Sequence, residues 1–236
     1  MLNNSIQYTI PAGEKRELFL LNEPTTNYHI IQEEGSSLLI HVIALPSPHD
    51  DNYTQHTSIT VEHNAANCRT EIFGLALLHG SQQNHLTTRV LHNVGEGYSS
   101  QLIKFVLDDA SKASFKGELK ILPDAQHVEA YQTNRNILLS RQADMVTEPQ
   151  LEIYADDVKA SHGATTGQLD DSALFYMQQR CISRESARKL LLCAFFDDVL
   201  RTLPDEQMQE NILEKINEYI GWLLINLVHT LNSVVE

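Results

Sequence analysis

Short apolar runs separated by turn-forming residues dominate the first two thirds of the chain. Such runs occupy residues 18–21, 28–31 and 38–44, and proline or glycine stands between them. Apolar runs of this length, bounded by turn formers, are typical of strands and not of helices. The segment 45–55 contains two prolines and an Asp pair, which predicts a protruding loop.

The middle of the chain contains a weak internal repeat. Val61-Glu-His-Asn64 and Val90-Leu-His-Asn93 are each followed by an apolar, strand-like run, and 114–121 alternates apolar and polar side chains. Recurrence of one unit at a fixed spacing is typical of stacked β-coils, because each coil buries its face on the next. Two copies are also compatible with chance, so a solenoid and a sandwich both fit. A doubly wound α/β sheet does not fit, because no helical pattern separates the strands.

The hydrophobic period changes near residue 169, where helices are expected. Asp170 and Asp171 suit the first turn of a helix that ends near residue 180. A second helix is expected from Ser183, and a third after Asp205. The tail 219–235 is too polar for a membrane span, and packing against helices or a partner explains it better. The apolar stripe of the third helix consists of Met208, Ile212, Ile216, Ile220 and Leu223.

Composition and charge narrow the classes of function. The 236 residues carry a formal net charge of −14, which disfavours binding to nucleic acid and to anionic membranes. No charged-then-apolar leader opens the chain, so secretion is not expected. Three widely spaced cysteines do not make a disulfide framework, and together these features predict a cytoplasmic protein.

Several familiar chemistries can be set aside from residue spacing. The glycine-containing segment 163–167 lacks the Gly-Lys-Ser/Thr of a phosphate-binding loop. Ser161 and His162 are neighbours on an expected strand and would face opposite sides, as would Asp156 and Asp157, so neither pair predicts catalysis. The 11 histidines show no His-x-x-x-His spacing, and the cysteines no Cys-x-x-Cys spacing, so a stable zinc or iron–sulfur site within this chain is not expected.

A family resemblance lies at the junction of the two halves. Its motifs are the run Pro149-Gln-Leu-Glu-Ile-Tyr-Ala-Asp-Asp-Val-Lys159, then Ser161-His-Gly-Ala-Thr165, then Leu174-Phe-Tyr176 and Arg180-x-Ile-Ser183. Together they resemble the SufB/SufD family of iron–sulfur cluster assembly scaffolds. The SufD branch is the more similar, because SufB proteins usually carry Glu where this chain has Gly163.

The resemblance implies a mainly β fold: a right-handed parallel β-helix (solenoid) over residues 1–168, followed by a small C-terminal α-helical domain over 169–236. It implies a non-catalytic scaffold subunit that pairs with a SufB-like subunit and docks a SufC-like ABC ATPase. His162 would lie at the subunit interface and act there as an iron ligand, beside a thiolate from the partner. No cofactor would be bound stably, although a transient iron–sulfur cluster could form at that interface. The aromatic residues Phe195, Phe196 and Trp222 are the candidate anchors for the ATPase.

Two departures from the family pattern keep alternatives open. Many SufD proteins have cysteine where this chain has Ala160, and family members usually begin with a helical domain that has no counterpart in the strand-like pattern here. The chain is therefore a naturally short member or a piece of a longer one, and a short member could form a homodimer that does the work of both subunits. Rival functions are a β-helix enzyme acting on polysaccharide, which is ranked far lower, and an interaction module without a metal role.

Overall fold

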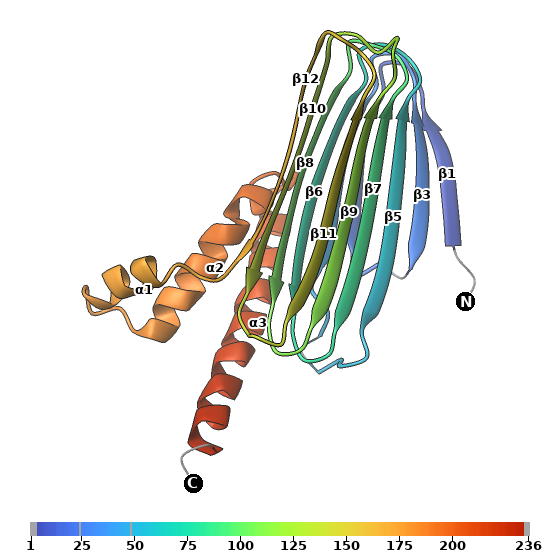
Figure 1. The fold of residues 1–236 in the computed structure, drawn as a ribbon. Coiled ribbons are helices and arrows are strands. Elements are labelled where there is room, and N and C mark those ends of the chain that lie inside the picture. Colours follow the sequence, from blue (N-terminus) through green and yellow to red (C-terminus); the bar gives the residue numbers. More distant parts are fainter. Residues whose placement is uncertain (1–3, 24, 48, 234–236) are drawn as a thin grey trace.

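The computed structural model describes residues 4–23, 25–47 and 49–233, except for the side chains of residue 4 and residues 222–233. In this part the chain forms twelve strands followed by three helices (Figure 1). The strands are β1 (Asn4–Ile10), β2 (Lys15–Leu21), β3 (Thr26–Gln32), β4 (Ser37–Ala44), β5 (Thr54–His63), β6 (Arg69–Leu78), β7 (Gln83–His92), β8 (Tyr98–Leu107), β9 (Lys112–Ile121), β10 (Val128–Leu138), β11 (Asp144–Ile153) and β12 (Val158–Gly167). The helices are α1 (Asp171–Gln178), α2 (Arg184–Leu200) and α3 (Glu206–Ser233).

Consecutive strands alternate between two parallel sheets. The odd-numbered strands form one sheet in the order β1-β3-β5-β7-β9-β11, and the even-numbered strands form the other in the order β12-β10-β8-β6-β4-β2. Each strand therefore pairs with the strand two places along the chain, as in a coil that rises by one strand spacing per turn. The predicted mainly β fold, a parallel β-solenoid followed by helices, is confirmed.

The internal repeat corresponds to one coil of this solenoid. Val61 pairs in register with Val90, and His63 with His92. The Asn93 side chain donates a hydrogen bond to the Asn64 Oδ1 atom 2.5 Å away, 29 residues earlier in the chain. The two Val-x-His-Asn copies therefore lie directly one above the other.

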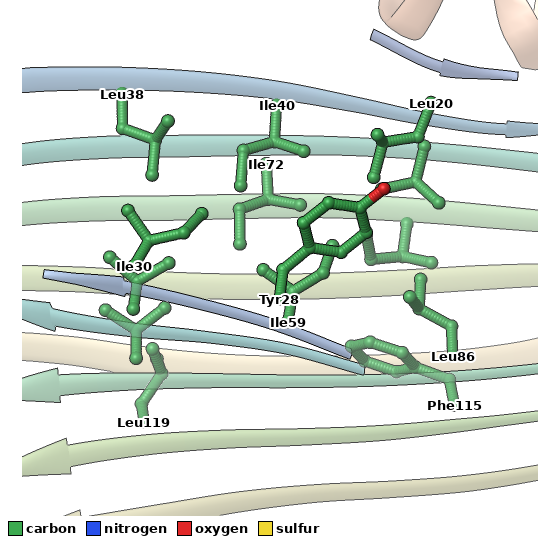
Figure 2. Close-up of a cluster of buried hydrophobic side chains, with 14 of the residues drawn as sticks. Leu20, Tyr28, Ile30, Leu38, Ile40, Ile59, Ile72, Leu86, Phe115 and Leu119 are labelled. Carbon is green, nitrogen blue, oxygen red and sulfur yellow. The ribbon is translucent and has the colours of Figure 1, made fainter. Parts of the chain in front are cut away.

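The inward-facing side chains of the two sheets make the main core (Figure 2). Along β7 and β9 nearly every second residue is buried, which confirms the alternation expected for 114–121. The buried side chains labelled in Figure 2 are Leu20, Tyr28, Ile30, Leu38, Ile40, Ile59, Ile72, Leu86, Phe115 and Leu119.

The last coil consists of β11 and β12, which are separated by a short turn: β11 ends at Ile153 and β12 starts at Val158. The small-residue segment 160–167 is itself strand, because it hydrogen-bonds along its length to β10. The turn between the two strands buries Ala155.

The first two helices start where the sequence predicts, at Asp170–Asp171 and at Ser183, although Asp170 and Ser183 are N-caps and not first-turn residues. Asp170 is the N-cap of α1 and accepts a hydrogen bond from the Ser172 backbone N–H, and Ser183 caps α2 by accepting from the Ser186 N–H. On α3, Ile212, Ile216 and Ile220 are buried as the predicted stripe requires. No helix in the described part of the chain is long and apolar enough to cross a membrane.

The helices α2 and α3 pack on the outer face of the even-numbered sheet, whereas α1 lies beside α2 and away from the strands, as Figure 1 shows. The strand β6 is buried on both faces over its last five residues, so it presents Leu75 and Leu77 to the helices. On β8 the Lys104 side chain is only 2% exposed and donates to the Phe195 carbonyl oxygen at 2.5 Å and to the Asp198 carboxylate at 2.7 Å. Helices and solenoid therefore share a second core. The predicted division into domains at residues 168 and 169 stays a prediction.

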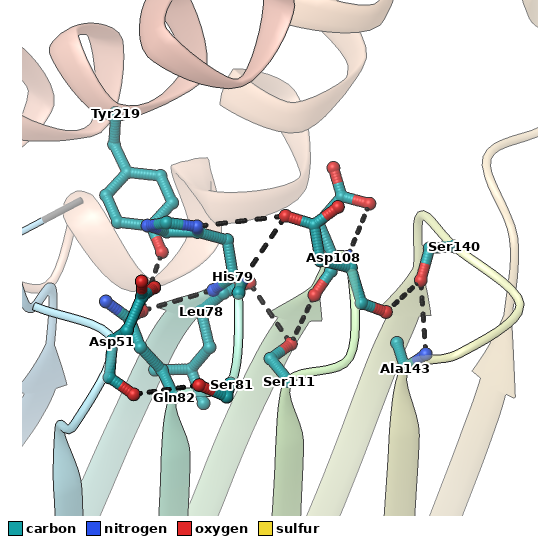
Figure 3. Close-up of polar contacts among 12 residues, drawn as sticks. Asp51, Leu78, His79, Ser81, Gln82, Asp108, Ser111, Ser140, Ala143 and Tyr219 are labelled. Carbon is teal, nitrogen blue, oxygen red and sulfur yellow. Dashed lines mark hydrogen bonds and ion pairs between the residues drawn. The ribbon is translucent and has the colours of Figure 1, made fainter. Parts of the chain in front are cut away.

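A polar contact adds to this second core at the turn between β6 and β7 (Figure 3). The Tyr219 hydroxyl on α3 donates to the Gln82 Oε1 atom at 2.9 Å, and the Gln82 amide donates in turn to the carbonyl oxygens of Ser47 and Asp50. The three partners belong to a turn, a loop and a helix that are far apart in the sequence. Because Gln82 and Tyr219 are both buried, this contact fixes where α3 lies against the sheet.

Candidate functional site: the open end of the solenoid

The solenoid ends in two unpaired strand edges. Within the described residues, β11 pairs only with β9, and β12 pairs only with β10. An edge strand presents backbone N–H and C=O groups that can pair with another chain. Pro149 lies within β11, and an edge is the position in a sheet where a residue without an N–H is tolerated.

His162 lies on β12 in register with Gln132 of β10. Gln132 is in turn in register with Gln101 of β8, so Gln101, Gln132 and His162 form one column across three neighbouring strands. Gln101 and Gln132 are buried inside the solenoid, whereas His162 is exposed at its end. Because residues in register on parallel strands face the same way, the column is an inward-facing polar row that opens at His162.

The polar row contains side-chain atoms without hydrogen-bond partners in the described part of the chain. These are both amide atoms of Gln132 and the nitrogen of Gln101, all buried. On the opposite sheet, Gly117 leaves room for this row, since a Cβ atom there would collide with the Gln132 amide. A buried amide without a partner is costly, so the row is a polar surface inside an otherwise apolar coil.

Besides the polar row, the open end at β11 and β12 exposes apolar side chains and has an ion pair at its margin. Val146, Ile153 and Tyr154 are between 42% and 57% exposed. Lys159 pairs with Glu129 at 2.8 Å, and their hydrogen bond raises the pKa of the lysine and lowers the pKa of the glutamate. An exposed apolar surface with charged residues at its margin is typical of an interaction surface.

The imidazole of His162 has no hydrogen-bond or ion-pair partner among the described residues. In that same part of the chain, no three His, Cys, Asp or Glu side chains gather to hold a metal ion. The cysteines are all free: Cys68 is buried, Cys193 half-buried and Cys181 exposed between α1 and α2. Burial raises the pKa of the Cys68 thiol, which favours an inert role in packing.

The predicted ATPase anchors are not brought together at the surface. Phe196 is fully buried in the second core, and Phe195 is half-buried beside it, with the two rings 5.5 Å apart. Trp222 belongs to α3, but its side chain lies outside the described residues. Among the side chains that the structure describes, the large apolar ones that the helices expose are Phe175, Tyr176, Leu190 and Leu213.

Sequence reasoning missed the polar row behind His162. The alternation along β10 carries the relevant signal, because Val128, Ala130 and Gln132 share one face of the strand. A glutamine in line with two apolar residues is a candidate buried polar group. The register that places it beside His162 depends on pairing between strands about 30 residues apart, which no local pattern specifies.

The fold and this end of it define a parallel β-solenoid protein whose last coil leaves two strand edges open and exposes apolar side chains. Comparison with known proteins identifies the class further. The family model "SUF system FeS cluster assembly, SufBD core domain" matches residues 25–195, which is most of the chain. The chain therefore belongs to the SufB/SufD family, and it is SufD-like.

Three curated relatives illustrate the similarity. The chain is 36% identical over 155 residues to the iron–sulfur cluster assembly protein SufD of Escherichia coli, covering 66% of this chain and 37% of that protein. It is 35% identical over 149 residues to a SufBD family iron–sulfur cluster assembly protein of Synechocystis, which covers 63% of this chain and 33% of that protein. It is 32% identical over 144 residues to the iron–sulfur cluster assembly protein SufD of Bacillus subtilis, which covers 60% of this chain and 32% of that protein. The matched part spans about a third of the length of these relatives.

Proposed function

We propose that this chain is a non-catalytic scaffold subunit for iron–sulfur cluster assembly, and that its open solenoid end pairs with a SufB-like subunit. The supporting observation is the open end itself, where two unpaired strand edges, exposed apolar side chains and His162 occur together. Strand edges recognise partners by adding a strand, with backbone hydrogen bonds supplying affinity and side chains supplying specificity.

In this proposal His162 contributes one ligand to a nascent cluster, which is the cargo of the assembly. Imidazole is an accepted iron ligand, and the other ligands, including a thiolate, would come from the partner. Two features support a shared site: His162 is exposed without a partner of its own, and the described part of the chain gathers no complete set of ligands. The cluster would be transient, and no cofactor would be bound stably by this chain alone.

The helical region would dock a SufC-like ABC ATPase. Phe195, Phe196 and Trp222 remain the predicted anchors, but Phe196 would have to leave the second core to contact a partner. The exposed Phe175 and Tyr176, at 63% and 58%, are better placed for a first contact. We propose the cytoplasm as the compartment, which the three free cysteines support.

Pairing can be tested with matched charge substitutions at the two ends of the solenoid. Val146 on β11 and Ile6 on β1 are similarly exposed, at 47% and 43%, and both lie on edge strands. Val146→Lys should abolish co-purification with the SufB-like subunit, whereas Ile6→Lys should leave it unchanged. Equal binding by both variants would show that the open end is not the interface. A second copy of this chain captured in place of the subunit would favour the homodimer.

The role of His162 needs a separate measurement on the reconstituted complex. His162→Ala should leave the melting temperature nearly unchanged, because surface substitutions typically shift stability by no more than about 0.5 kcal/mol. Cluster formation with iron and sulfide, followed by charge-transfer absorption, should nevertheless fall sharply. His56→Ala is the control, since His56 is an exposed histidine on β5. A destabilised His162→Ala variant that builds clusters at the normal rate per folded molecule would assign His162 to packing.

A further inference from the structure

A small cavity lies where the solenoid joins the helical region. Its volume is about 240 Å³, and its walls come from residues 138–141, residues 168 and 169, and the first turns of α1 and α2. Three arginines line it, namely Arg141, Arg184 and Arg188, and the lining includes a single carboxylate, Asp171. The chain as a whole has 31 acidic and 17 basic residues, so this concentration of positive charge is unusual for the molecule.

The positive charge in the cavity is poorly compensated. Arg184 and Asp171 are 3.7 Å apart and both are mostly exposed, so this ion pair contributes little. In the described part of the chain, neither Arg141 nor Arg188 has a carboxylate within ion-pairing distance. The buried Nε atom of Arg188 also lacks a hydrogen-bond partner among the described residues.

The nearby carboxylate of Asp108 does not neutralise Arg188. Arg188 opposes the rise in the pKa of Asp108 that burial causes, but the two groups form no ion pair. One oxygen of the Asp108 carboxylate instead accepts the Asp109 N–H at 2.9 Å, in the turn beside Ser140 that Figure 3 shows. A buried guanidinium nitrogen without an acceptor is costly, and a bound acceptor would remove that cost.

We propose that this cavity is a binding site for a phosphate-class oxyanion. Guanidinium groups bind phosphate through paired hydrogen bonds, and three of them can serve the several oxygens of a tetrahedral anion. A carboxylate has two oxygens and satisfies one guanidinium. The volume lies below the roughly 300–1,000 Å³ of pockets for drug-sized ligands, so a small anion fits better than a nucleotide. This inference does not depend on the proposed scaffold function.

The test is calorimetric titration of the whole chain with inorganic phosphate at constant ionic strength, with sodium chloride as the reference salt and acetate as a carboxylate probe. We expect saturable binding of one phosphate per chain, at least about tenfold weaker in Arg188→Met. Arg141→Gln is the second variant, because Arg141 is exposed on a turn and its loss should leave the fold intact. Arg201→Gln is the control, since Arg201 lies on the surface and pairs with Asp197.

The outcomes separate the site from a general charge effect. Phosphate binding weakened in both Arg188→Met and Arg141→Gln, but not in Arg201→Gln, supports the proposal. Absence of saturable phosphate binding overturns it, as does equal binding by all variants. Acetate binding as tight as that of phosphate would overturn the assignment to a tetrahedral oxyanion.

Discussion

Two neighbouring histidines inside the solenoid should make the protein sensitive to mild acid. His63 and His92 are both fully buried, in register, with their rings 4.4 Å apart and edge-on. The His63 Nε2 atom donates to the Thr70 hydroxyl, because that hydroxyl donates to the Gln32 Oε1 atom. The His92 Nε2 atom bonds to the Ser99 hydroxyl at 2.8 Å.

These surroundings hold both imidazoles in the neutral form. Burial lowers the pKa of His92 from 6.5 to about 4, and burial together with His92 lowers the pKa of His63 well below 6.5. As the pH falls below about 6.5, the unfolded chain binds protons that the folded chain does not, so stability is lost. The loss due to His92 continues until the pH reaches about 4, where the folded protein also becomes protonated.

The substitution to test is His92→Gln. Gln32, His63 and His92 are in register on β3, β5 and β7, so Gln32 shows that a glutamine side chain fits in this buried column. Between about pH 7.5 and about pH 5.5, the shift of His92 alone should cost the wild type about 1.3 kcal/mol of unfolding free energy. His92→Gln should lose that much less over the same interval, because its side chain does not titrate. Any loss of packing in the variant is the same at both pH values and cancels.

The assay is urea denaturation of wild type and variant at both pH values, with the exposed His162→Gln as control. The control should lose as much stability as the wild type. If His92→Gln also loses as much as the wild type, then His92 is not held neutral by burial and the reasoning is wrong.

Two further predictions concern packing. Gly95→Ala should destabilise the protein by about 1–3 kcal/mol, because the new Cβ atom would collide with the backbone of Gln126. Gly163→Ala is the control: its Cβ atom meets open space, so stability should change by no more than about 0.5 kcal/mol. Thermal melts of the two variants check this. Asp198→Ala should cost about 2 kcal/mol, because it removes the carboxylate that the buried Lys104 ammonium binds; the loss is smaller than for a fully buried pair, since the Asp198 side chain is 54% exposed. Lys104→Met should cost less, about 1 kcal/mol, because it removes the buried charge and keeps a similar volume. Equal losses of the two variants in urea denaturation would refute this.

Local patterns in the sequence determined the kinds of element and where the helices start. Apolar runs between turn formers gave the strands, Asp170 and Ser183 marked the starts of two helices, and the two Val-x-His-Asn copies marked one coil. The motif around His162 identified the family. These features are readable because hydrophobic period and capping act between residues a few positions apart.

The contacts between coils were decided by the tertiary structure. Pairing between strands about 30 residues apart placed Gln132 beside His162 and left β11 and β12 as open edges. Packing of the helices on the even-numbered sheet buried Phe196, which the sequence marks as an anchor for a partner, and brought three arginines to one cavity. Helical period shows that a residue lies on an apolar face, but whether that face meets the protein's own sheet or another chain depends on long-range packing.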